Sequence, residues 1–201
     1  MLVRWMVLVV LWGVVPVSAS PTTPLPAAHA QRFILAQTVG LPGQLSRSVL
    51  QMTDTFRAQM LGAIARGDIA GAIALWELEM GRQAPLWLQA FQAAFSTDNR
   101  RAGPCIEVAR SVFEGFKRLG ESPSYVRFTA QGSRFLGFEM SAGKSSSTVQ
   151  VSELRMHVVV QVKDRFYDAF TGPAGLPTAE YLKRLVTEEG ATITSQLVTS
   201  P

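Results

Sequence analysis

Three side chains in this 201-residue sequence are of the types that together perform nucleophilic catalysis: Cys105, His157 and Asp168. A thiolate can attack a carbonyl carbon, an imidazole can take or return the proton, and a carboxylate can fix the imidazole in one tautomer. Cys105 is the only cysteine of the chain, and His29 is the only other histidine. The three residues are therefore the candidate catalytic set, provided that the fold brings them together.

The segment around His157 and Asp168 has the pattern of a β-hairpin. Its first half is a β-branched run typical of a buried strand, made of Val158, Val159, Val160 and Val162. Residues 163–165 are polar and predict the turn, and residues 166–170 alternate large and small side chains as a returning strand does. If the loop has two residues, positions 157 and 168 lie on one face, offset by about 7–8 Å and within side-chain reach. A loop of odd length would place them on opposite faces.

Cys105 is predicted to open a helix. It follows a polar loop that ends in Gly103 and Pro104, and residues 106–119 carry apolar side chains at helical spacing up to Gly120. The free N–H groups and the positive dipole end at a helix start favour a thiolate and can stabilise a developing oxyanion. Asn99 is a candidate for one further oxyanion donor, although an asparagine in a loop also serves as a turn or cap residue.

The N-terminus predicts export. Residues 5–15 form an apolar run after a single charge, Arg4, and small residues lead to a cleavage site after Ala19. The run is shorter than the about 20 residues of a membrane span, so we expect a secreted or periplasmic protein without a stable membrane anchor after cleavage. A lone cysteine in such a protein cannot form an internal disulfide, which favours a reactive role.

The rest of the chain predicts one fold of helices and strands. Helices are expected from about residue 46 to residue 64, after Asp68 and from Pro85, then strands at 125–128, 134–140 and 149–154 with a Gly/Ser loop at 142–148. Thr178 is expected to cap a final helix to residue 186. The organisation is a signal peptide (1–19), a spacer (20–45), a helical pre-region (46–97), a catalytic domain (98–190) and a polar tail (191–201).

Charge and ligand chemistry narrow the classes of function. The net charge of +4 is scattered and predicts no nucleic-acid partner. One cysteine and one well-placed histidine fall short of a metal ligand set, so neither a metal nor another cofactor is expected. The methionines and aromatic residues of the helical pre-region predict a packed core, with a ligand or partner groove as the alternative.

Three short stretches, residues 103–109, 157–162 and 167–182, resemble the papain-fold toxin domains of bacterial polymorphic toxin systems, within the papain-like and NlpC/P60 cysteine peptidase superfamily. The resemblance covers residues 99–185. It implies an α+β fold in which a nucleophile-bearing helix packs on an antiparallel sheet, with Cys105, His157 and Asp168 in the catalytic positions. Asn99 corresponds to the oxyanion-hole residue by offset only. Such toxin domains commonly end very large exported proteins, whereas this chain is short and has its own predicted signal peptide.

The expected function is an exported cysteine hydrolase or acyl transferase acting on amide bonds of a protein or peptide substrate. The residues do not distinguish a protease from a deamidase or a transglutaminase. The resemblance implies a toxin or effector and allows for an immunity or inhibitor protein as a partner. Two alternatives stay open: an NlpC/P60-type peptidoglycan peptidase or amidase, and a non-catalytic binding module whose helical region is the interaction surface.

Overall fold

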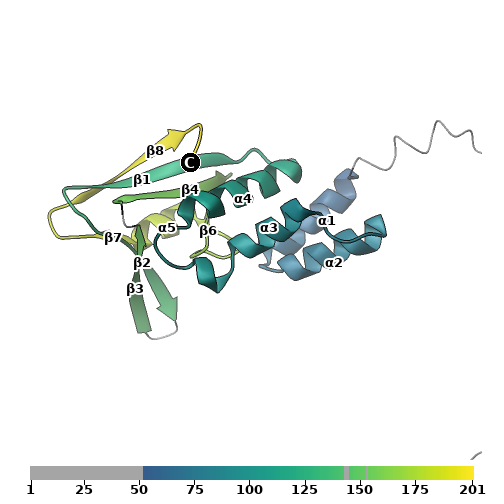
Figure 1. The fold of residues 1–201 in the computed structure, drawn as a ribbon, viewed down its shortest axis with the longest axis horizontal. Coiled ribbons are helices and arrows are strands. Elements are labelled where there is room, and N and C mark those ends of the chain that lie inside the picture. Colours follow the sequence, from purple (N-terminus) through teal and green to yellow (C-terminus); the bar gives the residue numbers. More distant parts are fainter. Residues whose placement is uncertain (1–51, 143–144, 153) are drawn as a thin grey trace, which may run out of the picture. The chain divides into compact units, whose positions relative to one another are not determined.

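The computed structural model describes residues 52–142, 145–152 and 154–201. The predicted signal peptide, the spacer and the first residues of the helical pre-region lie outside these ranges. The described residues form five α-helices, one short 3₁₀ helix and two antiparallel sheets (Figure 1). The predicted α+β class is therefore confirmed.

Four helices precede the first strand. They are α1 (Asp54–Ala65), α2 (Ile69–Met80), α3 (Leu86–Ala94) and α4 (Cys105–Arg118), with the 3₁₀ helix η1 (Thr97–Asn99) before α4. Asp68 caps α2 as predicted, because its side chain accepts the N–H of Gly71. The first helix was predicted to begin near residue 46, but Thr53 is extended and its hydroxyl accepts the N–H of Phe56, which starts α1 at Asp54.

The larger sheet has the strand order β6-β5-β4-β1-β8. Its strands are β1 (Ser124–Gln131), β4 (Met156–Val162), β5 (Arg165–Tyr167), β6 (Leu176–Pro177) and β8 (Thr192–Val198). The smaller sheet has the order β3-β2-β7, made of β2 (Leu136–Ala142), β3 (Ser145–Ser152) and β7 (Leu185–Thr187). Helix α5 (Thr178–Arg184) lies between β6 and β7 in the chain. Among the described helices, none is long and apolar enough to cross a membrane.

Strand β4 separates two hydrophobic clusters, which explains its unbroken run of valines. Val158, Val160 and Val162 belong to a helical cluster with buried residues of α1 to α4. Val159 belongs to a sheet cluster with residues of β1, β2, β3, β5 and α5. A strand buried on both faces needs apolar side chains at successive positions rather than alternate ones.

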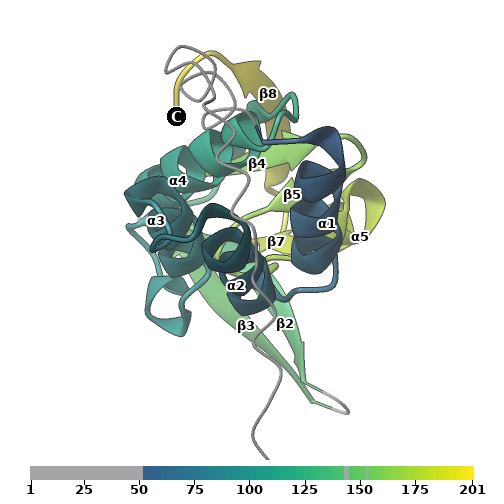
Figure 2. The ribbon, with the colours of Figure 1, turned by 90° about the vertical axis from the view of Figure 1, so that its right-hand side faces the viewer.

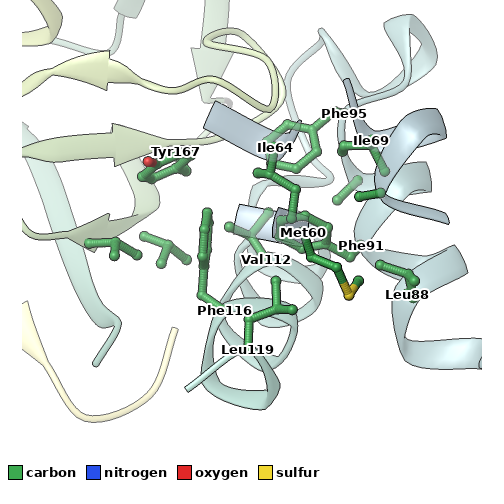
Figure 3. Close-up of a cluster of buried hydrophobic side chains, with 14 of the residues drawn as sticks. Met60, Ile64, Ile69, Leu88, Phe91, Phe95, Val112, Phe116, Leu119 and Tyr167 are labelled. Atoms are coloured by element: carbon green, nitrogen blue, oxygen red, sulfur yellow. The ribbon is translucent and has the colours of Figure 1, made fainter. Parts of the chain in front are cut away.

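The helical cluster lies between the helices and one face of the larger sheet. Met60, Phe91 and Phe116 converge there from α1, α3 and α4, and Tyr167 reaches the same cluster from β5 (Figure 3). The view of Figure 2 shows α1 to α4 gathered on this side of the strands. The helices predicted as a pre-region thus share one core with the helix that carries Cys105.

Two segments predicted to lack regular structure form strands. The predicted Gly/Ser loop is shorter than expected, because Ser146 and Thr148 pair with Ser141 and Glu139 in the β2–β3 ladder. This hairpin projects from the rest of the fold in Figures 1 and 2. The predicted polar tail contains β8, which pairs with β1 from Tyr125 to Gln131. Most β8 side chains are exposed, so an edge strand there tolerates the polar composition that suggested a tail.

The last predicted helix is also corrected at both ends. The Thr178 hydroxyl donates to the carbonyl of Asp164 and is not the helix cap, a position taken by Pro177. The helix stops at Arg184, because Leu185 and Val186 belong to β7 and pair with Phe138 and Gly137 of β2. Backbone pairing with β2 therefore ends the helix.

Candidate active site

The β4–β5 hairpin places His157 and Asp168 on one face. Val162 pairs with Arg165, so the connecting loop has the two residues that the parity argument required. The register, extended by one residue, brings position 168 opposite Val159 and diagonal to His157. Strand β5 ends at Tyr167, so Asp168 lies just beyond the strand and not inside it as predicted.

The chain turns at Asp168 because its side chain, and not a neighbouring strand, accepts the next backbone N–H groups. Asp168 Oδ1 accepts the N–H groups of Phe170 and Thr171, each at 2.9 Å, and the Thr171 hydroxyl accepts the N–H of Asp168 at 3.0 Å. Such aspartate-centred turns satisfy backbone donors that a continuing strand would pair. They also fix the carboxylate in one orientation.

The second oxygen of this carboxylate holds the histidine. His157 Nε2 lies 2.9 Å from Asp168 Oδ2, with the two side chains only 1% and 2% exposed. The hydroxyl of Tyr181 on α5 donates to the same Oδ2 at 2.7 Å. The sequence analysis missed Tyr181, since no motif or strand register relates a residue of α5 to Asp168.

Cys105 is the first residue of α4, as predicted, and it is half-buried. Pro104 is the N-cap, and Gly103 has a φ of 111°, a conformation that favours glycine. The first intrahelical bond runs from the Val108 N–H to the Pro104 carbonyl. The N–H groups of the residues before Val108, from Cys105 onward, therefore have no partner within the helix.

The thiol and the imidazole meet at one small cavity. Cys105, His157 and Asp168 line it together, and the space between them is too narrow for a water molecule. His157 Nδ1 is buried, and among the described residues it has no hydrogen-bond partner of strict geometry. Because Asp168 occupies Nε2, Nδ1 is the ring nitrogen left to exchange a proton with the thiol.

The charges of the three groups support one another. Burial raises the pKa of Cys105, but the neighbouring His157 and the N–H groups of Val158 and Ile106 outweigh it and bring the pKa below 9.0. Burial lowers the pKa of His157, but hydrogen bonding and charge attraction from Asp168 and Cys105 raise it to about 9. Burial likewise raises the pKa of Asp168, and His157 and Tyr181 lower it below 3.8. Each shift favours the charged form of its group, which is thiolate for Cys105, imidazolium for His157 and carboxylate for Asp168.

Asn99 lines the same cavity, but its side-chain donors point elsewhere. Asn99 Nδ2 donates to the carbonyls of Ala93 at 2.9 Å and Ala94 at 3.4 Å, at the end of α3. The amide nitrogen is thus engaged as a cap of α3, and the oxyanion role of Asn99 stays a prediction. The backbone N–H of Cys105 has no partner within the helix, and its predicted role in the oxyanion hole stays a prediction.

The loop before Cys105 is tied to the turn after Asp168. Arg100 Nε donates to the Ala169 carbonyl at 3.1 Å, and Arg101, which also lines the cavity, donates from Nε to the Asp98 carbonyl. The sequence analysis named neither arginine. The Arg100 bond joins the segment that precedes α4 to the segment that carries the carboxylate, and the Arg101 bond lies within the loop itself.

Within the described residues, no three histidine, cysteine, aspartate or glutamate side chains are grouped so that they could hold a metal ion. The absence of a cofactor stays a prediction.

No protein-family model matches the chain, and neither a curated protein nor a solved structure shows significant similarity to it. Any functional assignment therefore depends on the geometry of the site.

Proposed function

We propose that the protein is a papain-like cysteine enzyme that performs acyl transfer at amide bonds with Cys105, His157 and Asp168. One observation carries the proposal: a buried imidazole is held by a carboxylate at Nε2, which leaves Nδ1 on the side of a cavity that the only cysteine also lines. The interaction of Cys105 with this imidazole raises the pKa of His157 and lowers that of the thiol. This is the arrangement expected of two groups that exchange a proton.

The reaction follows from the three side chains. The Cys105 thiolate attacks the amide carbon, an S–C bond forms, and the carbonyl electron pair moves to oxygen, which the N–H groups at the start of α4 stabilise. His157 Nδ1 gives its proton to the amide nitrogen, the C–N bond breaks, and a thioester and a free amine result. Water, deprotonated at Nδ1, then releases the acid and the thiol. An amine in place of water gives transamidation.

Asp168 supports this cycle without exchanging a proton itself. Its anionic form accepts the Nε2–H of His157, which leaves Nδ1 as the exchanging atom in both proton transfers. The lowered pKa of Asp168 keeps the carboxylate charged across the neutral range. A neutral side chain at this position would no longer stabilise the imidazolium.

A shallow groove offers a path for the substrate beside the thiol. Ala93, Ala94 and Ser111 line it between α3 and α4, and it shares Asn99 and Val108 with the cavity. An extended peptide that occupied this groove would pass beside the cavity that holds the thiol. The proposal therefore includes a protein or peptide substrate.

The biological setting extends the proposal. Export and the resemblance to papain-fold toxin domains favour a secreted or periplasmic toxin or effector, whose partner would be an immunity or inhibitor protein. The NlpC/P60-type alternative shares the same chemistry and differs in substrate. Incubation of the purified protein with peptidoglycan and, separately, with protein substrates distinguishes the two, with Cys105→Ala as the control for each.

Alkylation of Cys105 tests the proposal directly, because the chain has no other thiol. Iodoacetamide should label Cys105 faster than free cysteine at pH 6–7, and His157→Gln should remove the advantage. The matched control moves the thiol along α4: Ser111→Cys combined with Cys105→Ala should react at an ordinary rate. Labelling of Cys105 no faster than free thiol contradicts the proposal.

The binding-module alternative has one supporting observation. A groove of the helical region is lined by Met80, Arg82, Arg118 and two tryptophans, Trp76 and Trp87, whose rings meet edge to face at 5.7 Å. Buried Trp76 Nε1 has no hydrogen-bond partner among the described residues. An unreactive Cys105 would favour this alternative, and a reactive one would favour the enzyme.

A further inference from the structure

The carboxylate of Asp168 accepts four hydrogen bonds, two at each oxygen, and the two oxygens accept from different kinds of donor. Oδ1 accepts two backbone N–H groups, from Phe170 and Thr171. Oδ2 is shared by two side chains, His157 at 2.9 Å and Tyr181 at 2.7 Å. The imidazole and the phenol therefore draw on the charge of the same oxygen.

Tyr181 is held where its hydroxyl can reach only this region. The side chain is fully buried, and its ring packs against Phe128 at 5.7 Å, Phe138 at 5.0 Å and Phe166 at 5.1 Å between ring centroids. Burial and the neighbouring Asp168 raise its pKa well above 10.0, so the phenol stays protonated. It acts as a hydrogen-bond donor at every pH at which the protein would work.

A second donor on Oδ2 changes what the carboxylate does to the imidazole. A phenol directs the positive end of its dipole at the shared oxygen, which reduces the negative charge that the imidazolium feels. It also prevents the carboxylate from rotating away from His157 Nε2. Both effects act on His157 through Asp168, without contact between Tyr181 and the thiol being required.

We infer that Tyr181 is a positioning residue of the proposed reaction, which fixes Asp168 Oδ2 on His157 and limits how tightly the imidazolium keeps its proton. The inference rests on the proposed function. In that reaction His157 must release its proton to the leaving amine, and an imidazolium held too tightly would release it slowly. The phenol thus adjusts the acid that the cycle needs.

The titration of His157 provides the test, and it needs no substrate. The chain has two histidines, so imidazole resonances in an NMR titration of the full chain are assigned with a His29→Gln variant. Tyr181→Phe keeps the packed ring and removes the hydroxyl. The midpoint for His157 should rise by about 0.5–1 pH unit, because one hydrogen bond to the carboxylate is lost.

The other two tyrosines of the chain supply matched controls. Tyr125 and Tyr167 are also buried, and neither hydrogen-bonds to Asp168, so Tyr125→Phe and Tyr167→Phe should leave the midpoint unchanged. A second experiment should shift the His157 midpoint in the opposite direction. In the double variant Tyr125→Phe/Tyr167→Phe, 3-fluorotyrosine labels position 181 alone, and this more acidic phenol is a stronger donor that should lower the midpoint. This experiment decides the question if Tyr181→Phe does not fold.

The outcomes separate the inference from the proposed function. An unchanged midpoint in folded Tyr181→Phe, or an unchanged midpoint with 3-fluorotyrosine, overturns the role of Tyr181 even if Cys105 is reactive. A lowered midpoint in folded Tyr181→Phe overturns the claim that the phenol limits how tightly the imidazolium keeps its proton. A shifted midpoint together with a Cys105 that labels no faster than free thiol overturns the enzyme proposal and leaves the coupling of Tyr181 to His157 in place.

Discussion

The two faces of β4 differ in what they bury. The buried members of the helical cluster are apolar or aromatic, and their polar atoms are the tyrosine hydroxyls and the indole N–H of Trp76. The buried polar side chains of the described residues are Ser133, Ser152, His157 and Asp168, and none of them lies on α1 to α4. The imidazole and the carboxylate therefore lie on the face away from the helices, beside a second apolar cluster, and the thiol reaches them from the start of α4.

A single strand serves both faces because its side chains alternate. Val158 and Val160 anchor β4 in the helical cluster, while His157 and Val159 point the other way. Buried charge is costly unless neighbours compensate it. The buried charged groups lie on the face away from the helical cluster, so the comparison predicts that substitutions in the helical cluster change stability and that substitutions around His157 change thiol reactivity.

The largest expected effect is on stability. Phe91 on α3 is fully buried and contacts Phe95 and Phe116 at ring-centroid distances of 5.3 Å and 5.2 Å. Phe91→Ala should lower the free energy of unfolding by about 3–5 kcal/mol, measured by urea denaturation. The pH profile of Cys105 alkylation in the folded protein should stay as in the wild type.

Leu86→Ala on the same helix is the control, because Leu86 is 81% exposed and its removal should change stability by less than about 0.5 kcal/mol. An altered alkylation profile in Phe91→Ala would show that the two faces of β4 are coupled, contrary to the comparison.

The next effect should be on reactivity. Asp168→Asn replaces one carboxylate oxygen with an NH₂ group, and each of the two oxygens accepts two hydrogen bonds that an NH₂ group cannot accept. The substitution also removes the negative charge that stabilises the imidazolium. Alkylation of Cys105 at neutral pH should slow by about 100-fold, since the thiolate loses its charged partner. The control is Asp164→Asn, the same chemical change in the exposed hairpin turn, which should react at the wild-type rate. Equal rates in both variants would exclude Asp168 from the thiolate–imidazolium pair.

The third effect concerns the pH dependence of stability. The folded pKa of His157, about 9, lies above its ordinary value of 6.5, so its contribution is complete below pH 6.5 and lost as the pH rises to about 9. The lowered pKa of Cys105 acts in the opposite direction, because that contribution grows as the pH rises toward 9.0. Because the His157 contribution is the larger one, the free energy of unfolding should fall by on the order of 1 kcal/mol between pH 6.5 and 9.

Urea unfolding at several pH values between 6 and 9 measures this slope. His157→Gln removes both the imidazole and the cause of the lowered cysteine pKa, so its stability should be nearly flat over the same range. A wild-type curve as flat as that of the variant would mean that His157 is not held as imidazolium.

The sequence predicted the parts of the site that depend on local signals. The strand of valines and the helix start at Cys105 each follow from a few neighbouring residues. The sequence placed a turn at residues 163–165 and left the loop length open, and the pairing of Val162 with Arg165 shows a loop of two residues. The face shared by positions 157 and 168 follows from the turn alone, because side chains alternate along a strand.

The features that the sequence did not predict depend on distant partners. β8 pairs with β1, β7 pairs with β2, and neither segment has a pattern that excludes a tail or a helix end. Tyr181 reaches Asp168 from another element, and its type and spacing match any buried position of an amphipathic helix. Long-range pairing decides such positions, and a single sequence does not display it.

Asn99 shows how a position in the sequence can suggest one role while the contacts in the fold indicate another. Its substitution should have the smallest effect of those considered. Proximity in sequence suggested a donor to the oxyanion, whereas its contacts to the Ala93 and Ala94 carbonyls indicate a cap that joins α3 to the loop before Cys105. Asn99→Ala should therefore lower the free energy of unfolding by about 1 kcal/mol and change Cys105 alkylation by less than about twofold. Asn99→Asp, which keeps the shape but loses the donor, should be at least as unstable, because a carboxylate would face two carbonyl oxygens. Turnover of an amide substrate that falls by about 100-fold with unchanged stability would instead restore the oxyanion role. It would also mean that a side chain of η1 acts in the reaction beside the thiol of α4, so that the helical side of the molecule supplies both the nucleophile and an oxyanion donor.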